Sequence, residues 1–228
     1  MTLAAAISVL FIGNSYTYVN DLPKTFAALA AAKGVHATVD SITEGGAPLE
    51  AHARNPRVAE KLRERAWDFV VLQEQSQRPA FDASQVEREV LPAAAELDRQ
   101  IHQARAQAQT VIFETWARRD GDSDNCKDMP AVCTRDGQQQ RLTQTYARLA
   151  RENHALLAPV GTAWSRARGW SLYQADGSHP SMLGTYLAAC VFFDVLTKQK
   201  SEGAPPLGAV AEADARALQK IADEVAAK

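Results

Sequence analysis

The sequence has few cysteines and no long apolar segment, and each shortage excludes a class of protein. Three cysteines in 228 residues are too few for a disulfide framework. No run of about 18 apolar residues occurs, so we expect no membrane-spanning helix. Lysine and arginine (25) nearly balance aspartate and glutamate (27), and the formal net charge of -2 predicts no basic surface for nucleic acid. No solenoid-length repeat occurs.

What is present fits a globular chain. Hydrophobic residues make up 46% and charged residues 23%, which is ordinary for a folded domain. The chain is long enough to bury a core without metals or disulfides, so we expect one domain over residues 1–228. Its first ten residues, MTLAAAISVL, lack the basic flank of a signal peptide, and we expect them to lead into the first strand rather than to form a leader.

Two of the cysteines leave an alternative open. Cys126 and Cys133 lie seven apart in a polar loop, where they could form a bridge or stay as free thiols. A bridge would favour a periplasmic or secreted protein, and free thiols a cytoplasmic one. Cys190 lies in an apolar helical stretch and is expected in the core.

Strand-like and helix-like stretches alternate along the chain. The strand-like runs cover residues 6–12, 37–42, 69–72, 110–114 and 155–160. The helix-like stretches cover residues 22–33, 49–65, 84–107, 137–153, 181–198 and 209–227. This alternation predicts an α/β fold with a five-stranded parallel sheet and helices on both faces. Ligands of such sheets bind beyond the carboxyl ends of the strands, so those positions are where we expect chemistry.

The ends of the first two strand runs carry a hydroxyl and a glycine pair. Ser15 follows Gly13 and stands near the start of the next helix, as a reactive hydroxyl or as a simple helix cap. Gly45 and Gly46 follow the second run. They could bring a backbone N–H close to a ligand, or form an ordinary turn before a helix that starts at Pro48.

Three further positions carry candidate side chains: two follow the third and fourth strand runs, and one precedes the last long apolar helical stretch. Gln73 and Gln75 follow the third run, as carboxamide donors toward a developing negative charge or as part of a polar loop. Trp116 follows the fourth run and could form the wall of a pocket or belong to the core. Asp176 and His179 lie three apart before the helical stretch 181–198. That Asp can hold the Nδ1–H of the His and leave Nε2 for proton transfer, or the turn can be a polar helix start.

Two of these segments resemble the conserved blocks of the SGNH (GDSL-like) hydrolases, and the resemblance spans about residues 11–187. The run FIGNSYT is similar to the first block, with Asn14 where many members have Asp, and DGSHP is similar to the last block. The resemblance implies a flavodoxin-like three-layer α/β/α sandwich. It also implies Ser15 as nucleophile, His179 as base and Asp176 as its partner.

The same resemblance implies an oxyanion hole built from the Ser15 amide, a glycine amide and an Asn side chain. Gly46 matches the glycine best, with Gly45 as the alternative. The third block normally supplies the Asn, but no Asn stands there in this sequence. We therefore expect Gln73 or Gln75 to replace it, and favour Gln73 because it directly follows the strand run.

The expected function is that of a serine esterase acting on small acyl esters, acetyl esters above all, with a small molecule or a carbohydrate as substrate. Four side chains could line its cleft or could equally be packing or surface residues: Tyr18, Arg78, Trp116 and Trp170. His52 follows the glycine pair and could approach the pocket, but a place outside it is favoured. The alternatives are a thioesterase or acyltransferase with the same triad, and an inactive carbohydrate-binding relative. A flavin or nucleotide binder is disfavoured because residues 13–17 offer few phosphate donors.

We expect no metal and no cofactor. Asp120, Asp122 and Asp124 imitate the start of a calcium loop, but Asn125 and Ala131 stand where such a loop requires Gly and Glu. A solvated acidic loop over residues 118–137 is therefore the expected structure.

Overall fold

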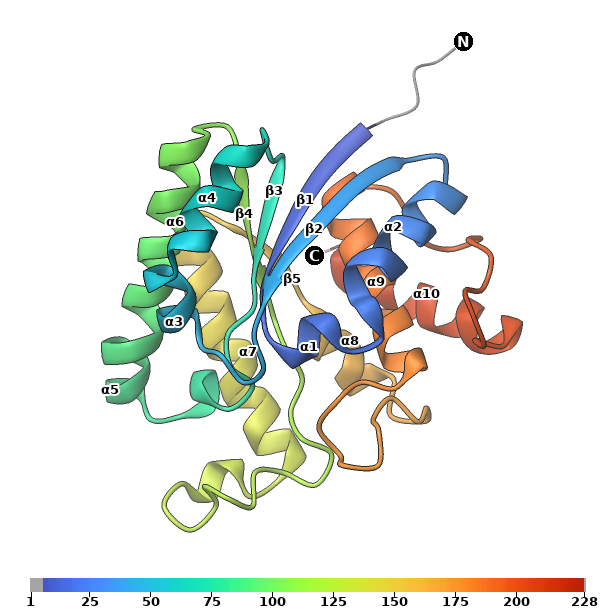
Figure 1. Cartoon of the computed structure of the whole chain (residues 1–228). Helices are drawn as coiled ribbons and strands as arrows, with labels where there is room; N and C mark the ends of the chain where they lie inside the picture. The colour runs from blue at the N-terminus through green and yellow to red at the C-terminus, as the bar shows by residue number, and fades with distance from the viewer. Residues whose placement is uncertain (1–5, 228) are drawn as a thin grey trace.

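The computed structural model describes residues 6–227 and has a five-stranded parallel sheet at its centre (Figure 1). The strands are β1 (Ala6–Gly13), β2 (His36–Thr43), β3 (Phe69–Leu72), β4 (Gln109–Phe113) and β5 (Leu156–Ala158). Their order is β2-β1-β3-β4-β5, and all four neighbouring pairs are parallel. The predicted sheet is confirmed; the first five of the residues expected to lead into β1 lie outside the described part of the chain.

Helices cover both faces of the sheet and give the predicted three-layer α/β/α sandwich (Figure 1). The α-helices are α1 (Ser15–Tyr18), α2 (Leu22–Ala32), α3 (Leu49–Arg54), α4 (Pro56–Glu64), α5 (Ala83–Gln85), α6 (Leu91–Ala104), α7 (Arg135–Glu152), α8 (Val160–Arg166), α9 (Met182–Thr197) and α10 (Glu212–Ala226). Short 3-10 segments are η1 (Val19–Asp21), η2 (Arg78–Ala80) and η4 (Pro130–Val132), and η3 (Val86–Val90) is a π-helical turn. Helices α3, α4, α6 and α7 cover one face, and α2, α8, α9 and α10 the other.

The apolar runs of the sequence explain the two layers. Along β1, Val9 and Phe11 pack into the core cluster that contains α2, α8, α9 and α10, whereas Leu10 and Ile12 pack into the cluster on the opposite face. Successive side chains of a strand point to opposite faces, so an uninterrupted apolar run fits a sheet that is buried on both sides.

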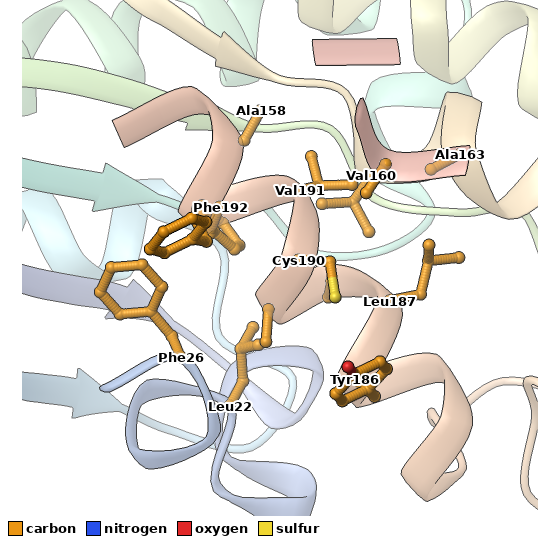
Figure 2. Close-up of a cluster of buried hydrophobic side chains, with 14 of the residues drawn as sticks. Leu22, Phe26, Ala158, Val160, Ala163, Tyr186, Leu187, Cys190, Val191 and Phe192 are labelled. Carbon is orange, nitrogen blue, oxygen red and sulfur yellow. The ribbon is translucent and has the colours of Figure 1, made fainter. Parts of the chain in front are cut away.

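Helix α9 is the most deeply buried helix of its layer. Every residue from 184 to 196 is buried, including Cys190, which confirms its predicted place in the core. Figure 2 shows Leu22 and Phe26 of α2 facing Tyr186 and Phe192 of α9. A helix that is apolar all round is stable only when surrounded, so α9 and the turn that leads into it are firmly placed.

Prolines account for two differences from the predicted helices. The stretch expected as one helix over residues 49–65 is two helices, because Pro56 has no N–H to continue the first, and Asn55 caps the second by accepting from the Arg57 N–H at 3.0 Å. The stretch 84–107 contains the π-turn η3 shortly before Pro92, whose ring also removes a backbone donor. Helix α8 was not predicted; it begins at Val160, where a strand was expected to end.

The predicted alternative of a cysteine bridge is the one present in the structure. Cys126 and Cys133 are joined by a disulfide, with their Cα atoms 4.6 Å apart. The compartment that the bridge would favour stays a prediction. Within residues 6–227, no helix is both long and apolar enough to cross a membrane.

Two carboxylates meet between α9 and α10. The Ser201 N–H donates to Asp194 Oδ1 at 2.6 Å and to Asp223 Oδ1 at 2.9 Å, and the Ser201 hydroxyl donates to both side chains. Burial, followed by the neighbouring Asp223, raises the pKa of Asp194 from 3.8 to about 9. One proton shared by the two carboxyl groups explains this direction.

This pair predicts a stability that falls as the pH rises. Between the unfolded pKa of 3.8 and the folded pKa of about 9, the folded chain holds a proton that the unfolded chain has released, so each pH step upward favours unfolding. Asp194→Asn carries an N–H in place of the shared proton. We expect the Tm of this variant to rise relative to that of the wild type with each pH step from 5 to 9, by several degrees over the range, since about 1 kcal/mol corresponds to about 2–4 °C in a chain of this size.

Thermal unfolding at pH 5, 7 and 9 measures this effect. The control is Asp128→Asn, which changes an exposed carboxylate and should leave the pH dependence of the wild type intact. Parallel curves for Asp194→Asn and the wild type would contradict the shared proton.

Candidate active site

Folding brings Ser15 and the Asp176–His179 turn together at the carboxyl edge of the sheet. His179 Nε2 lies 2.9 Å from Ser15 Oγ across 164 residues of sequence, and His179 Nδ1 lies 2.5 Å from Asp176 Oδ2. A carboxylate only accepts hydrogen bonds, so Nδ1 carries the ring proton and Nε2 accepts from the Ser15 hydroxyl. The three predicted residues therefore form one continuous hydrogen-bonded chain.

The turn that carries His179 is held by its own backbone. Asp176 Oδ1 accepts from the N–H groups of Ser178 at 2.9 Å and His179 at 3.0 Å. Gly177 has a φ of 68°, in the left-handed region, and a Cβ there would lie 3.3 Å from the Arg119 guanidinium. Partial burial alone would raise the pKa of Asp176, but the hydrogen bonds from His179 and from these N–H groups together hold it below its usual value. Asp176 is therefore a charged acceptor at neutral pH.

Asn14 places Ser15 at the first position of α1. Its Oδ1 caps the helix by accepting from the Tyr16 N–H at 3.2 Å, and its Nδ2 donates to the Ala47 carbonyl at 3.1 Å. The Glu44 N–H donates to the Gly13 carbonyl at 3.2 Å. The glycine turn after β2 is thus tied at two points to the turn that presents Ser15.

Two backbone N–H groups remain free at this junction. Within residues 6–227, the N–H groups of Ser15 and Gly46 make no hydrogen bond to the protein. Gly46 is exposed and has a φ of 69°, a conformation that suits glycine. Gly45, the alternative from the sequence, sits against Tyr18, whose hydroxyl would lie 3.3 Å from a Cβ at that position.

Gln73 does not occupy the place that the sequence predicted. Its side chain is fully buried, and its Oε1 accepts from the Asn14 N–H at 2.8 Å and from the Thr17 hydroxyl at 3.0 Å. Its Nε2 donates to the Glu74 carbonyl at 2.5 Å. This geometry does not favour Gln73 as an oxyanion donor, because its Nε2 donates to Glu74 and its Oε1 supports the turn that carries Ser15.

Gln75 is also engaged elsewhere. Its Oε1 accepts from the N–H groups of Gln77 and Arg78 at 2.8 and 3.1 Å, and its Nε2 donates to Gln77 Oε1 at 3.1 Å. These contacts close the loop after β3 upon itself. His52 is buried beneath the site, where its Nε2 donates to the Gly13 carbonyl at 2.8 Å, and burial lowers its pKa. His52 thus supports the turn without facing the Ser15 hydroxyl.

A column of stacked aromatic rings supports the His179 turn. Tyr16 stacks on Trp116 with ring centres 4.4 Å apart, and Trp116 stacks on Trp164 at 3.8 Å. The Tyr16 hydroxyl lies 2.8 Å from the Ser178 hydroxyl, and Trp116 Nε1 donates to the Ser178 carbonyl at 3.0 Å. Both polar atoms hold the residue before His179. Trp116 is 1% exposed, so the prediction that it lines a cleft is wrong and the alternative of a core residue is confirmed.

Sequence reasoning did not identify Tyr16 as part of this support, and a substitution tests its contribution. Tyr16→Phe keeps the stacked ring and removes the hydrogen bond to Ser178, which frees the turn that positions His179. We expect kcat for a small ester to fall about three- to tenfold, the range of one neutral hydrogen bond, with KM unchanged. Steady-state kinetics well below the unfolding temperature measure this split.

The matched control is Tyr146→Phe. Tyr146 is also fully buried and pairs with another hydroxyl, that of Thr115, at 3.0 Å. It should lose comparable stability and keep its kcat. Equal losses of kcat in the two variants would contradict a positioning role for Tyr16.

The remaining predicted residues lie apart from this chain of hydrogen bonds. Arg78 pairs with Glu89 at 2.6 Å, and Trp170 Nε1 donates to Asp214 at 2.9 Å, so both serve packing. Tyr18 is 46% exposed and stands beside Gly45 at the surface.

The three aspartates of the loop after β4 have protein partners. Asp120 pairs with Arg119 at 2.8 Å and Asp124 with Arg118 at 2.8 Å. The fully buried Asp122 accepts from Gln77 Nε2 at 2.9 Å. These contacts tie the loop to its surroundings and to the segment after β3.

No protein-family model matches the chain, and no curated protein matches its sequence. Several solved structures do match. A protein from Slackia heliotrinireducens assigned to the SGNH hydrolases is 34% identical, with 84% of this chain and 99% of that chain covered and a TM-score of 0.68. A DUF4886 family protein from Bacteroides uniformis is 21% identical, with 96% and 94% covered and a TM-score of 0.83. An acetyl xylan esterase from Geobacillus stearothermophilus is 15% identical, with 92% and 100% covered and a TM-score of 0.58.

The likenesses to the Bacteroides uniformis protein and to the acetyl xylan esterase, at 21% and 15% identity, show a shared fold alone. The likeness to the Slackia heliotrinireducens protein combines a shared fold with 34% identity along 99% of the relative. The chain therefore belongs to the SGNH hydrolase superfamily.

Proposed function

We propose that the protein is a serine esterase that releases small acyl groups, acetyl above all, with Ser15, His179 and Asp176 as its triad. The observation that carries the proposal is the continuous chain from Asp176 Oδ2 through the His179 ring to Ser15 Oγ, with contacts of 2.5 and 2.9 Å. Nucleophile and base within hydrogen-bond reach, and a third group that orients the base, are the requirements of this chemistry. Membership of a superfamily of ester hydrolases supports the same reaction.

The reaction proceeds through an acyl-enzyme. Ser15 Oγ attacks the ester carbonyl while His179 Nε2 takes the hydroxyl proton, and Asp176 stabilises the imidazolium that results. The negative oxygen of the tetrahedral intermediate is held by the N–H groups of Ser15 and Gly46. The alkoxide then leaves with the proton from His179, and a water molecule repeats the cycle on the acyl group.

The surface of the chain favours small, dissolved esters over lipid aggregates. Large apolar side chains that are exposed within residues 6–227 are Tyr18 and Met182. Two isolated side chains do not make the broad apolar patch that binding to a micelle or membrane would need. A shared fold with an acetyl xylan esterase supports acetyl as the acyl group. The alcohol portion can also be a carbohydrate, although Trp116 is buried and cannot stack on a sugar ring.

The experiment is active-site labelling together with an ester panel. We expect a fluorophosphonate probe to label Ser15 alone, as located by mass spectrometry, and p-nitrophenyl acetate to be hydrolysed faster than the hexanoate or decanoate. A wild-type protein that neither reacts with the probe nor turns over any ester would contradict the proposal and favour an inactive binding relative. An added acceptor alcohol that captures most of the acetyl group would favour an acyltransferase.

A further inference from the structure

We propose that an apolar cavity between α2, α9 and residues 207–210 binds the alcohol portion of the ester, as an apolar alkyl or aryl group. The inference rests on the proposed esterase function and adds to it a substrate class. The alcohol portion is the group that leaves in the first step of the reaction.

The cavity has the size and the lining of a small-molecule site. Its volume is about 350 Å³, within the range of about 300–1,000 Å³ for ligand pockets. Apolar walls come from three separate elements, namely Ala28 of α2, Met182 and Tyr186 of α9, and Leu207 and Val210 of the segment before α10. The polar part of the lining consists of Asn20, Asp21, Lys24 and Thr25. An alkyl chain or a ring finds apolar contact on several sides there.

One wall of this cavity is hydrogen-bonded to the segment that follows His179. Asn20, which lines the cavity, lies five residues beyond Ser15, and its Nδ2 donates to the carbonyl of Pro180 at 2.9 Å and to the Thr185 hydroxyl at 3.0 Å. Pro180 follows His179 in the sequence. The segment that leaves Ser15 and the segment that leaves His179 are therefore joined at the edge of the cavity.

The backbone at this edge is held in an uncommon conformation. Asn20 and Asp21, both at the cavity, have φ values of 56° and 53°, so two consecutive residues other than glycine lie in the left-handed region. Such conformations cost free energy and persist where surrounding contacts enforce them, often at ligand sites. The two hydrogen bonds of Asn20 are the enforcing contacts, and the tight bend separates the start of α2 from α1.

An exposed methionine stands at the same edge. Met182 is 43% exposed and lies three residues beyond His179, and its methyl group is 3.8 Å from where a Cβ on Gly208 would be. An unbranched thioether adapts its shape to apolar ligands. A bound apolar group would cover this side chain, which otherwise faces water.

The direction of the reaction assigns the cavity to the alcohol. His179 Nε2 must return its proton to the leaving alkoxide, so the oxygen of the alcohol lies on the His179 side of the carbonyl. The oxyanion lies on the other side, toward the N–H of Gly46. The cavity is lined by Met182, three residues beyond His179, so an alcohol group on this side of the carbonyl would extend toward it.

A pair of isomeric esters distinguishes binding of the alcohol portion from binding of the acyl group. Hexyl acetate and ethyl hexanoate have the same atoms, but the long chain is on the alcohol in the first and on the acyl group in the second. With ethyl acetate as the short reference, we expect kcat/KM of the wild type to be at least tenfold higher for hexyl acetate and no higher for ethyl hexanoate. Acid release at constant pH measures all three.

A substitution in the cavity links this preference to the structure. Ala28 is exposed on α2 and faces the cavity, so Ala28→Phe fills the space without disturbing the core. We expect the ratio of kcat/KM for hexyl acetate to kcat/KM for ethyl acetate to fall from at least tenfold to about one. The matched control is Ala31→Phe, an exposed alanine of the same helix outside the cavity, which should keep the preference.

Two results would overturn the assignment. One is an unchanged preference in Ala28→Phe, and the other is a preference for ethyl hexanoate, which would give the cavity to the acyl group. If the wild type hydrolyses none of the esters, the esterase function fails, and binding is still measurable in Ser15→Ala by methionine-methyl NMR with hexan-1-ol. The chain has three methionines; the Met182 signal should shift and that of Met129 should not, and an unmoved Met182 at saturating alcohol refutes the cavity as a binding site.

Discussion

Ser15→Ala is expected to lower kcat for p-nitrophenyl acetate by about 10⁵–10⁶, the loss seen when a triad nucleophile is removed. Without Oγ the proposed acyl-enzyme cannot form. Of the proposed oxyanion hole and nucleophile, the N–H groups of residue 15 and Gly46 then remain to polarise the ester carbonyl. The side chain is half-buried, and the one hydrogen bond of its hydroxyl to another residue in the range 6–227 is the bond to the His179 ring, so the fold should persist. Single-turnover and steady-state assays, with thermal unfolding beside them, measure both quantities.

A serine of similar burial provides the control for this substitution. Ser165 is half-buried on α8, away from the hydrogen-bonded chain, and Ser165→Ala should keep full activity. A purified Ser15→Ala protein that retains more than a hundredth of wild-type turnover would exclude Ser15 as the nucleophile.

Asp176→Asn is expected to lower kcat by about 10³–10⁴. Oδ1 of this side chain is committed to the N–H groups of Ser178 and His179, so the new amide nitrogen must take the place of Oδ2. It would then donate toward His179 Nδ1 and move the ring proton to Nε2. A ring protonated at Nε2 cannot accept the Ser15 proton, although the geometry is preserved.

A neighbouring carboxylate gives the comparison. Asp120 is exposed and pairs with Arg119, and Asp120→Asn should leave kcat within twofold. If kcat of Asp176→Asn stayed within tenfold of the wild-type value, Asp176 would not be the residue that fixes the tautomer of His179.

The topology and much of the site could be predicted because they depend on local patterns and one rule of sheet geometry. Apolar runs separated by helix-length stretches are enough to predict a parallel sheet, and its strand ends must share one edge. Ser15, Gly46 and the Asp176–His179 turn could therefore be placed together across the whole sequence. The interruptions near Pro56 and Pro92 were not predicted, although each proline removes a backbone donor from a predicted helix.

The parts that could not be predicted depend on orientation and on packing between distant segments. A glutamine at a strand end is equally able to donate or accept, and only the fold shows that Gln73 turns its oxygen to Asn14. The partners of Tyr16 lie 100 residues or more away along the chain, and no periodicity relates them. Helix α8 is too short to show a repeating apolar pattern.

The stacked column of Tyr16, Trp116 and Trp164 has a consequence for how this enzyme loses function on heating. The rings that hold the turn before His179 also fill the interior, so this turn should not unfold before the core does. Inactivation and global unfolding should coincide in temperature. Two of the four tryptophans stand within the column, so their fluorescence would report on both events at once.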